Sequence, residues 1–215
     1  MTDTSPFGAP EPGAAPAELL EAGLVVGSDG KARCFWGGGT PDYVAYHDTE
    51  WGRPVRGDDA LFERMCLEAF QSGLAWITIL RKRAAFRAAF DGFAIDKVAA
   101  YSDADAARLM ADAGIVRNRM KIEAALHNAR VAADLPDGLS ALLWASAPAR
   151  APRPRTRAEI PATTAESTSM AKDLKKRGFK FVGPTTAYAL MQATGMVDDH
   201  LAGCWVPPVD GPGAA

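Results

Sequence analysis

The feature that most constrains this chain is the spacing of its apolar residues between positions 58 and 195. They recur every three or four residues, in runs that end near glycine or proline. Because an α-helix has 3.6 residues per turn, this spacing gives each run one apolar face. No convincing alternation of apolar and polar residues, the mark of a half-buried strand, interrupts the pattern. The chain is therefore predicted to be all-α. The expected helices cover residues 58–72, 74–90, 95–100, 102–113, 117–134, 139–146, 167–177 and 184–194.

Composition limits the class of protein further. Of the 215 residues, 48% are hydrophobic and 23% are charged, which is the balance of a soluble globular protein. No apolar run approaches the roughly 20 residues that span a bilayer, and no signal peptide is visible, so we expect no membrane association. Three cysteines argue against a disulfide framework and predict a cytoplasmic protein. The net charge of −2 means that nucleic-acid binding would need positive charge concentrated on one face.

Three regions differ in composition. Residues 1–33 are poor in aromatic residues and rich in alanine, proline and glycine, and we expect a disordered or loosely ordered extension. Residues 34–207 form the predicted folded domain, and residues 208–215 a flexible tail rich in glycine and proline. Nothing in the sequence indicates an oligomer, so a monomer is expected.

Residues 34–52 stand out because they hold two of the five tryptophans and two of the four tyrosines. Glycine and proline interrupt the segment, so most of it is not expected to form a regular helix or strand. A loop with this many large aromatic side chains is either an exposed apolar surface or a binding site.

Four potential metal ligands lie in two pairs, Cys34 with His47 and His200 with Cys204. A Cys2His2 set suits zinc, and four protein ligands would leave no position for a catalytic water, so the role would be structural. The alternative is that these are buried small side chains and ordinary histidines. Spacing alone favours that alternative, because the two pairs match no standard zinc-finger spacing.

The aromatic residues suggest a ligand when they are combined with one carboxylate. Glu68 lies at the edge of the apolar face of its helix, and Trp76 lies on the next predicted helix. Aromatic faces stack on flat ligands and attract cations, while a carboxylate accepts hydrogen bonds from ring nitrogens. The combination suits a flat cationic heterocycle such as an alkylated nucleobase. For any single tryptophan or tyrosine, core packing is the alternative explanation.

A helix–hairpin–helix pattern covers residues 112–121, with Gly114 in its turn and Arg117 and Lys121 beside it. Such a turn offers backbone N–H groups and a helix N-terminus to a phosphate. The motif is short, and each basic cluster alone is also explained as a solvated helix face.

At this point several blocks together resemble DNA-3-methyladenine glycosylase I, a family of helix-hairpin-helix DNA glycosylases. The resemblance extends from about Cys34 to about Pro207. The matching blocks are Asp42–Gly52, Cys66–Glu68 with Gln71–Thr78, Asp112–Arg117, Lys175–Gly183 and Asp199–Cys204.

The resemblance implies two helical lobes, with the N- and C-terminal segments tied by a structural zinc. It reverses the preference from spacing alone, and the implied zinc ligands are Cys34, His47, His200 and Cys204. The implied lesion-recognition and catalytic residue is Glu68. The implied base-binding aromatics are Trp36, Tyr46 and Trp76, with Tyr43 and Trp51 as further wall residues. The implied DNA contacts are Gln71 and Leu74 in a wedge-like turn, and Gly114, Arg117 and Lys121 at the hairpin.

The implied activity is release of 3-methyladenine as a free base from alkylated double-stranded DNA, by base flipping and without strand cleavage. One departure is Met120, where we expect a small residue near the hairpin, and another is the bulky Phe35. Two alternatives are a zinc-stabilised module that binds DNA without chemistry and a zinc hydrolase. A binding module without chemistry is expected to have lost the pocket carboxylate or the aromatic residues, and this sequence keeps both. A zinc hydrolase needs an open position on the metal, and four protein ligands leave none.

Overall fold

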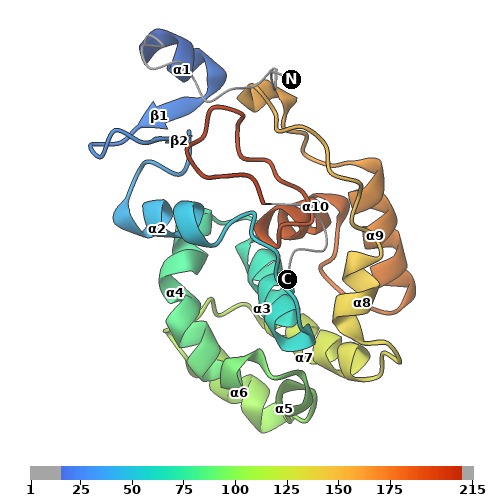
Figure 1. Ribbon diagram of the computed structural model, residues 1–215. Coiled ribbons are helices and arrows are strands. Elements are labelled where there is room, and N and C mark those ends of the chain that lie inside the picture. The colour runs from blue at the N-terminus through green and yellow to red at the C-terminus, as the bar shows by residue number, and fades with distance from the viewer. Residues whose placement is uncertain (1–15, 210–215) are drawn as a thin grey trace. The chain divides into compact units, whose positions relative to one another are not determined.

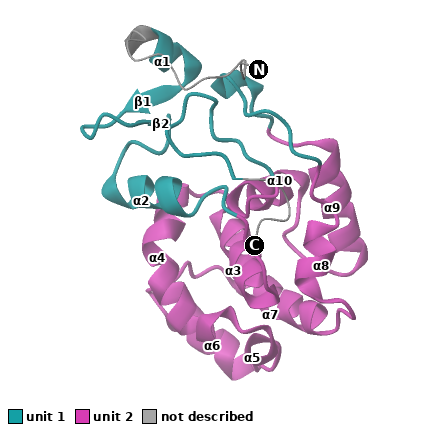
Figure 2. Ribbon diagram, viewed as in Figure 1, with its two compact units in different colours: residues 1–53, 149–161, 197–215 teal, residues 54–148, 162–196 magenta. Residues whose placement is uncertain are grey.

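The computed structural model describes residues 16–209, and the chain divides into two compact units (Figures 1 and 2). Unit 1 comprises residues 1–53, 149–161 and 197–215, of which 1–15 and 210–215 lie outside the described residues. Unit 2 comprises residues 54–148 and 162–196. Within the described residues, no helix combines the length and apolar character needed to cross a membrane.

Unit 2 is built from helices, which confirms the all-α prediction for this part of the chain. The elements are α3 (Asp58–Gln71), α4 (Trp76–Ala89), η1 (Asp91–Phe93), α5 (Ile95–Ala99), α6 (Asp103–Ala111), α7 (Arg119–Ala133), α8 (Gly138–Trp144), α9 (Ala165–Lys176) and α10 (Pro184–Ala193). Each α-helix lies within a few residues of its predicted range, and the short helix η1 was not predicted. Local signals set several of the ends: Ser102 and Asp105 form a capping box at α6, and Pro184 opens α10 at a position where its missing N–H is not needed.

The core of unit 2 surrounds α3, which packs against α4, α7, α8 and α10 (Figure 1). Five phenylalanines are fully buried there and contact one another in stacked and edge-on pairs. These are Phe62, Phe70, Phe86, Phe90 and Phe93. Burial of one such side chain contributes about 1.5–3 kcal/mol, so apolar packing accounts for the stability of this unit.

Unit 1 has little regular structure, but it is more ordered than the sequence suggests. It contains α1 (Pro16–Ala22), β1 (Leu24–Val26), β2 (Ala32–Cys34), α2 (Pro41–Thr49) and η2 (Arg157–Glu159). The two strands pair in antiparallel register, with Val25 opposite Arg33. Residues 16–33 thus form α1 and most of a β-hairpin where a disordered or loosely ordered extension was expected, and residues 1–15 lie outside the described residues.

Helix α2 corrects a second prediction, that most of residues 34–52 would be irregular. Thr40 caps this helix through its side chain, Pro41 occupies the first helical position and Asp42 adds a negative charge in the first turn. All three are start signals of an α-helix. These signals are present in the sequence, but the three glycines at 37–39 favoured an irregular segment.

Candidate functional site

Three of the four predicted metal ligands come together in unit 1. One ligand atom from each of Cys34, His47 and Cys204 lies within 4.8 Å of the others, and all three residues are buried. Cys34 ends β2, His47 lies in α2, and Cys204 follows α10 in the C-terminal loop. The Sγ of Cys204 is 3.6 Å from the Nε2 of His47. Two thiols and an imidazole at this separation are able to hold one metal ion.

His200 lies beside this group of three rather than within it. Its ring centroid is 5.0 Å from that of His47, and its Nε2 is 3.5 Å from the backbone oxygen of His47. Gly52, with φ of +73°, makes room for this ring, since a Cβ there would stand 2.8 Å from the Cε1 of His200. The placement of His200 as a fourth ligand remains a prediction.

Both histidines are oriented by carboxylates. The Nδ1 of His47 lies 2.8 Å from Asp48, and the Nδ1 of His200 lies 2.9 Å from Asp198. A carboxylate accepts a hydrogen bond from N–H, so these partners assign the proton to Nδ1 and leave the lone pair on Nε2. Carboxylate–histidine pairs of this kind orient histidines that bind metals. The sequence analysis missed both aspartates, although each lies within two positions of its histidine.

The two thiols also fit a cation. The hydrogen bond with Cys34 lowers the pKa of Cys204 to about 4, and the neighbouring His47 acts in the same direction. The same hydrogen bond, together with burial, raises the pKa of Cys34. One thiolate is thus favoured in the protein alone, whereas two adjacent buried thiolates need a positive ion between them.

A buried arginine supports the orienting carboxylate of His47. Arg33 is 3% exposed and donates hydrogen bonds of 2.8–3.1 Å to Asp48 and of 2.7–2.9 Å to Asp29. Burial acts to raise the pKa of Asp48, but the bonds from Arg33 and His47 outweigh it and lower that pKa to about 2. The β1–β2 hairpin therefore supports the candidate metal site through Arg33, which bonds the carboxylate that orients His47.

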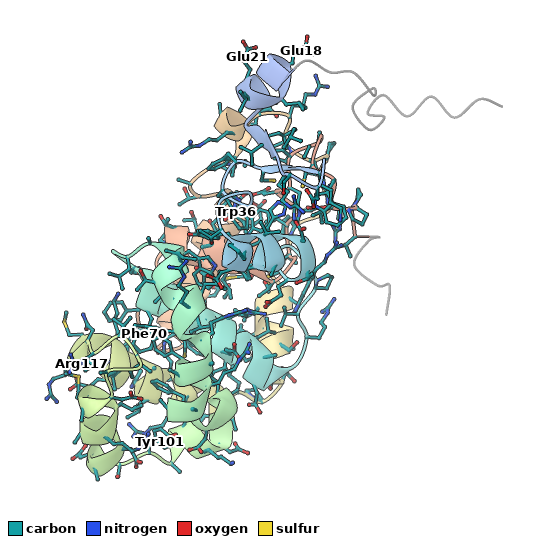
Figure 3. All side chains as sticks on the ribbon, turned by 90° about the vertical axis from the view of Figure 1, so that its left-hand side faces the viewer. Glu18, Glu21, Trp36, Phe70, Tyr101 and Arg117 are labelled. Carbon is teal, nitrogen blue, oxygen red and sulfur yellow. The ribbon has the colours of Figure 1, made fainter. Side chains whose placement is uncertain are left out.

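An aromatic cluster adjoins the metal ligands in unit 1. The ring of Trp36, labelled in Figure 3, lies 4.9 Å from Trp51, 5.9 Å from Tyr43 and 6.2 Å from Tyr46. Trp51 in turn lies 4.7 Å from His200. Tyr46 and Trp51 are buried, while Trp36 and Tyr43 are partly exposed. The four predicted aromatic residues of unit 1 are thus gathered in one cluster.

Unit 2 carries the predicted recognition residue Glu68. Glu68 is 6% exposed in α3 and borders a cavity of about 10 Å³, which is about the space of one water. The other lining residues are Met65, Leu174, Val182, Thr186, Ala187 and Leu190. Burial raises the pKa of Glu68 to about 8, although the charge of Arg64 opposes the shift. The free protein therefore holds this carboxyl largely protonated at neutral pH.

The turn after the Glu68 helix is tight and exposed. Gly73 has φ of +81°, and the backbone N–H of Leu74 donates to the oxygen of Gln71 at 2.6 Å. Leu74 is 40% exposed. Trp76 follows at the first position of α4 and is partly buried.

The hairpin between α6 and α7 is closed by side chains. The backbone N–H of Gly114 donates to Asp112 at 2.7 Å, and Lys82 donates to the backbone oxygens of Ala113 and Gly114. A Cβ on Gly114 would stand 3.1 Å from that of Ala85, so the turn approaches α4 closely. Arg117 extends away from the unit (Figure 3).

Lys121 does not add a surface charge beside this turn, in contrast to its predicted role. It is 8% exposed, and its ammonium donates to the backbone oxygens of Phe70 at 2.9 Å and Ser72 at 2.6 Å. Its positive charge is therefore engaged within unit 2, at the end of α3.

Helix α7 also holds the loop that follows α9. Buried Asn128 bonds both the N–H and the C=O of Lys180, and His127 bonds the oxygen of Gly178 at 2.8 Å. The next residue, Phe181, is a partly exposed aromatic with φ of +56°, a conformation that costs a non-glycine residue about 1–3 kcal/mol. His127 thus has a structural role in holding this loop.

Comparisons with known proteins show which family the sequence matches. The model of the methyladenine glycosylase family matches residues 36–207, so α1, β1 and β2 precede the matched region. DNA-3-methyladenine glycosylase 1 of Escherichia coli (strain K12) is 44% identical over 185 residues, which cover 84% of this chain and 99% of the relative.

Two solved structures share the fold. One is 3-methyladenine DNA glycosylase I, with a TM-score of 0.77 and 42% identity over 80% of this chain and 98% of the other. The second is a variant of 3-methyladenine DNA glycosylase I in complex with 3-methyladenine. It has a TM-score of 0.74 and 34% identity over 78% of this chain and 94% of the other.

Proposed function

The chain belongs to the methyladenine glycosylase family, and from this premise we propose that it hydrolyses the N-glycosidic bond of 3-methyladenine in alkylated DNA. The observation that carries the proposal is Glu68, a buried carboxyl group beside a small cavity, in a chain that matches the family over residues 36–207. The products are the free base and an abasic site.

The reaction requires little acid catalysis. The methylated base carries a positive charge, so it leaves with the electron pair of its bond to C1′ and becomes neutral. A water oxygen then bonds to C1′ and releases one proton. No lysine needs to attack C1′, and the activity is therefore monofunctional, without strand cleavage. No described side chain needs to act as a strong general base.

Glu68 recognises the positive charge of the base. An opposite charge nearby favours the carboxylate form, so binding of the cationic base lowers the raised pKa of Glu68. At neutral pH, base binding is then coupled to the release of a proton from this residue. Normal adenine has no such charge, and Glu68 consequently discriminates against it. We assign Trp36, Tyr46 and Trp76 to stacking on the base, and Tyr43 and Trp51 to the support of these rings.

The flipped nucleotide leaves a gap in the duplex, and Leu74 is the proposed wedge for it. The exposed position of Leu74 after Gly73 and its tight turn support this role. Gln71 at the start of the turn is assigned to the unpaired partner strand. Gly114 and Arg117 are assigned to a DNA phosphate at the hairpin.

We assign zinc to the metal site, held by Cys34, His47 and Cys204 with His200 as the fourth ligand. Two thiolates and two imidazoles suit zinc, and a closed shell of four ligands supplies rigidity rather than chemistry.

Double-stranded DNA with alkylated bases is the proposed partner, and one copy of the chain is proposed to act alone. A DNA substrate places the activity in the compartment that holds the chromosome. This agrees with the cytoplasmic location expected from the unpaired cysteines.

The test is release of free base from methylated duplex DNA, separated by chromatography into 3-methyladenine, 7-methylguanine and 3-methylguanine. The wild-type protein is expected to release 3-methyladenine. Glu68→Gln has the same shape without the charge, and its rate is expected to fall by about 100-fold or more, because recognition of the cation is lost. Full activity of Glu68→Gln contradicts the assignment. Binding to methylated DNA without release of any base supports a binding module instead.

A further inference from the structure

Lys121 is a buried cation whose ammonium group bonds backbone oxygens. It is 8% exposed, and its ammonium contacts the oxygens of Phe70 and Ser72. Withdrawing an ammonium group from water is unfavourable unless strong hydrogen bonds compensate for it. A methionine or leucine would fill the same space without this cost. The position of the two acceptors therefore determines what the lysine does.

Both acceptors lie at the C-terminal end of α3, where carbonyl groups lack helical partners. A positive charge stabilises such an end by bonding the free carbonyls and by interacting with the helix dipole. Ser72 directly precedes Gly73 and Leu74, so one of the two bonds holds the turn itself. Two backbone bonds also hold this turn, from the N–H of Ser72 to the oxygen of Ala69 at 3.3 Å and from the N–H of Leu74 to the oxygen of Gln71 at 2.6 Å.

The backbone of Lys121 lies in the helix–hairpin–helix motif, in the first turn of α7. Its backbone N–H donates to the side chain of Asn118, which caps the first turn of α7 at 3.2 Å. The same residue therefore bonds the N-terminus of the second hairpin helix through its backbone and the turn after α3 through its side chain. Its sequence distance from Ser72 is 49 residues, so no local segment provides this connection.

We propose that Lys121 is a positioning residue for unpairing of the DNA, and this inference rests on the proposed function. It joins the turn that carries Leu74 to the start of α7, so that the hairpin and the wedge form one rigid piece. Binding of a phosphate at the hairpin then sets the depth at which Leu74 enters the duplex. Lys121 touches neither the base nor the reacting bond.

A double-mutant cycle with Leu74 tests the proposal. Single-turnover release of 3-methyladenine from methylated duplex DNA is measured for wild type, Lys121→Met, Leu74→Ala and the double variant. Lys121→Met is expected to slow release by about 10- to 100-fold, because a small misplacement of a positioning group has effects of this size. The double variant is expected to be no slower than Leu74→Ala, since both changes remove the same wedge. Affinity for free 3-methyladenine, followed by tryptophan fluorescence, is expected to remain unchanged.

The chain offers a matched control in Lys97, an exposed lysine on α5 of the same unit. Lys97→Met removes the same charge and is expected to release base at the wild-type rate. If Lys121→Met does not fold, Lys121→Gln keeps N–H donors in place and is used in the same cycle. The inference is overturned if the Lys121 variants release base at the wild-type rate. It is also overturned if the fall in rate of the double variant equals the product of the falls in the two single variants. The wild-type protein separates the two claims, because its release of 3-methyladenine upholds the proposed function whatever the Lys121 variants do.

Discussion

The two units keep their side chains in place by different means. Unit 2 surrounds α3 with buried phenylalanines, and its helices form from local sequence signals. Unit 1 has a small apolar cluster that includes the two metal-site cysteines, and the rest of its order comes from charged and polar contacts. Figure 2 shows how much of unit 1 consists of loops. An apolar core tolerates changes in metal content, whereas a network of thiols, imidazoles and carboxylates depends on the metal.

The two units carry different residues of the proposed function. Glu68 depends on the helical core of unit 2, and Trp36 and Tyr46 depend on the loops around the cysteines of unit 1. Conditions that weaken unit 1 alone should therefore displace Trp36 and Tyr46 while Glu68 keeps its place in α3.

The largest difference is expected from removal of the metal. Cys204→Ser deletes one ligand, and a structural zinc site contributes on the order of 10 kcal/mol to its own folding unit. We expect loss of bound zinc and of hydrogen-exchange protection in residues 24–53, with protection of α3 and α7 retained. Zinc content after dialysis and exchange measured by mass spectrometry check this.

The matched control lies in the other unit. Phe90→Ala empties part of the core of unit 2 and is expected to cost about 3–5 kcal/mol in the free energy of unfolding. Its zinc content per folded molecule should equal that of wild type. If either variant loses hydrogen-exchange protection equally in unit 1 and unit 2, the two units are not stabilised by different means.

The next effect is a pH dependence of opposite sign in the two units. Glu68 has a folded pKa of about 8 against a usual value of 4.5, so it binds its proton more tightly in the folded state. Its stabilising contribution is complete below pH 4.5 and is lost as the pH rises to 8, by up to about 1.4 kcal/mol per pH unit. Asp48 has a lowered pKa, and its contribution is lost instead as the pH falls from 3.8 towards 2.

Urea unfolding of wild type and Glu68→Gln at pH 6 and pH 8 isolates the first contribution, and Asp48→Asn at pH 3 and pH 5 isolates the second. The advantage of Glu68→Gln over wild type should grow with pH. A constant difference between these two proteins would show that the carboxyl group is not protonated in the folded state.

The smallest effect is expected from Arg33, which supports Asp48 and contacts no metal ligand side chain. Arg33→Met removes the bonds to Asp48 and Asp29, and we expect about a tenfold loss of zinc affinity, the lower end for residues that orient metal ligands. Competition with a chromophoric chelator measures it. Glu21→Gln removes an exposed charge from α1 in the same unit and should leave the affinity unchanged. If wild type, Arg33→Met and Glu21→Gln bind zinc with equal affinity, Arg33 stabilises only the β1–β2 hairpin.

The helices of unit 2 could be predicted from sequence because their signals are local. Ser102 with Asp105 and the glycine after α3 act within a few residues. The hairpin of β1 and β2 escaped prediction because three-residue strands are too short to show alternation. Its order depends on Arg33, whose partner Asp48 is 15 residues away.

The site was predicted unevenly for the same reason. Residue types and the family resemblance indicated the metal ligands and Glu68, since chemistry restricts which residues serve. The inward direction of Lys121 could not be read from its sequence, because a lysine near a hairpin looks the same whether it faces a phosphate or two carbonyl groups. That distinction depends on contacts across 49 positions.

The separation of the metal ligands along the chain has a consequence for biosynthesis. His47 and Cys204 are 157 positions apart, so His47 and Cys34 leave the ribosome long before Cys204 exists. During synthesis at about 5–20 residues per second, this interval lasts on the order of ten seconds. Throughout it, the Cys34 thiol has neither its thiol partner nor a complete metal shell. The nascent chain is therefore most vulnerable to oxidation at this cysteine, and a damaged copy would carry an ordered helical unit with a site that cannot close.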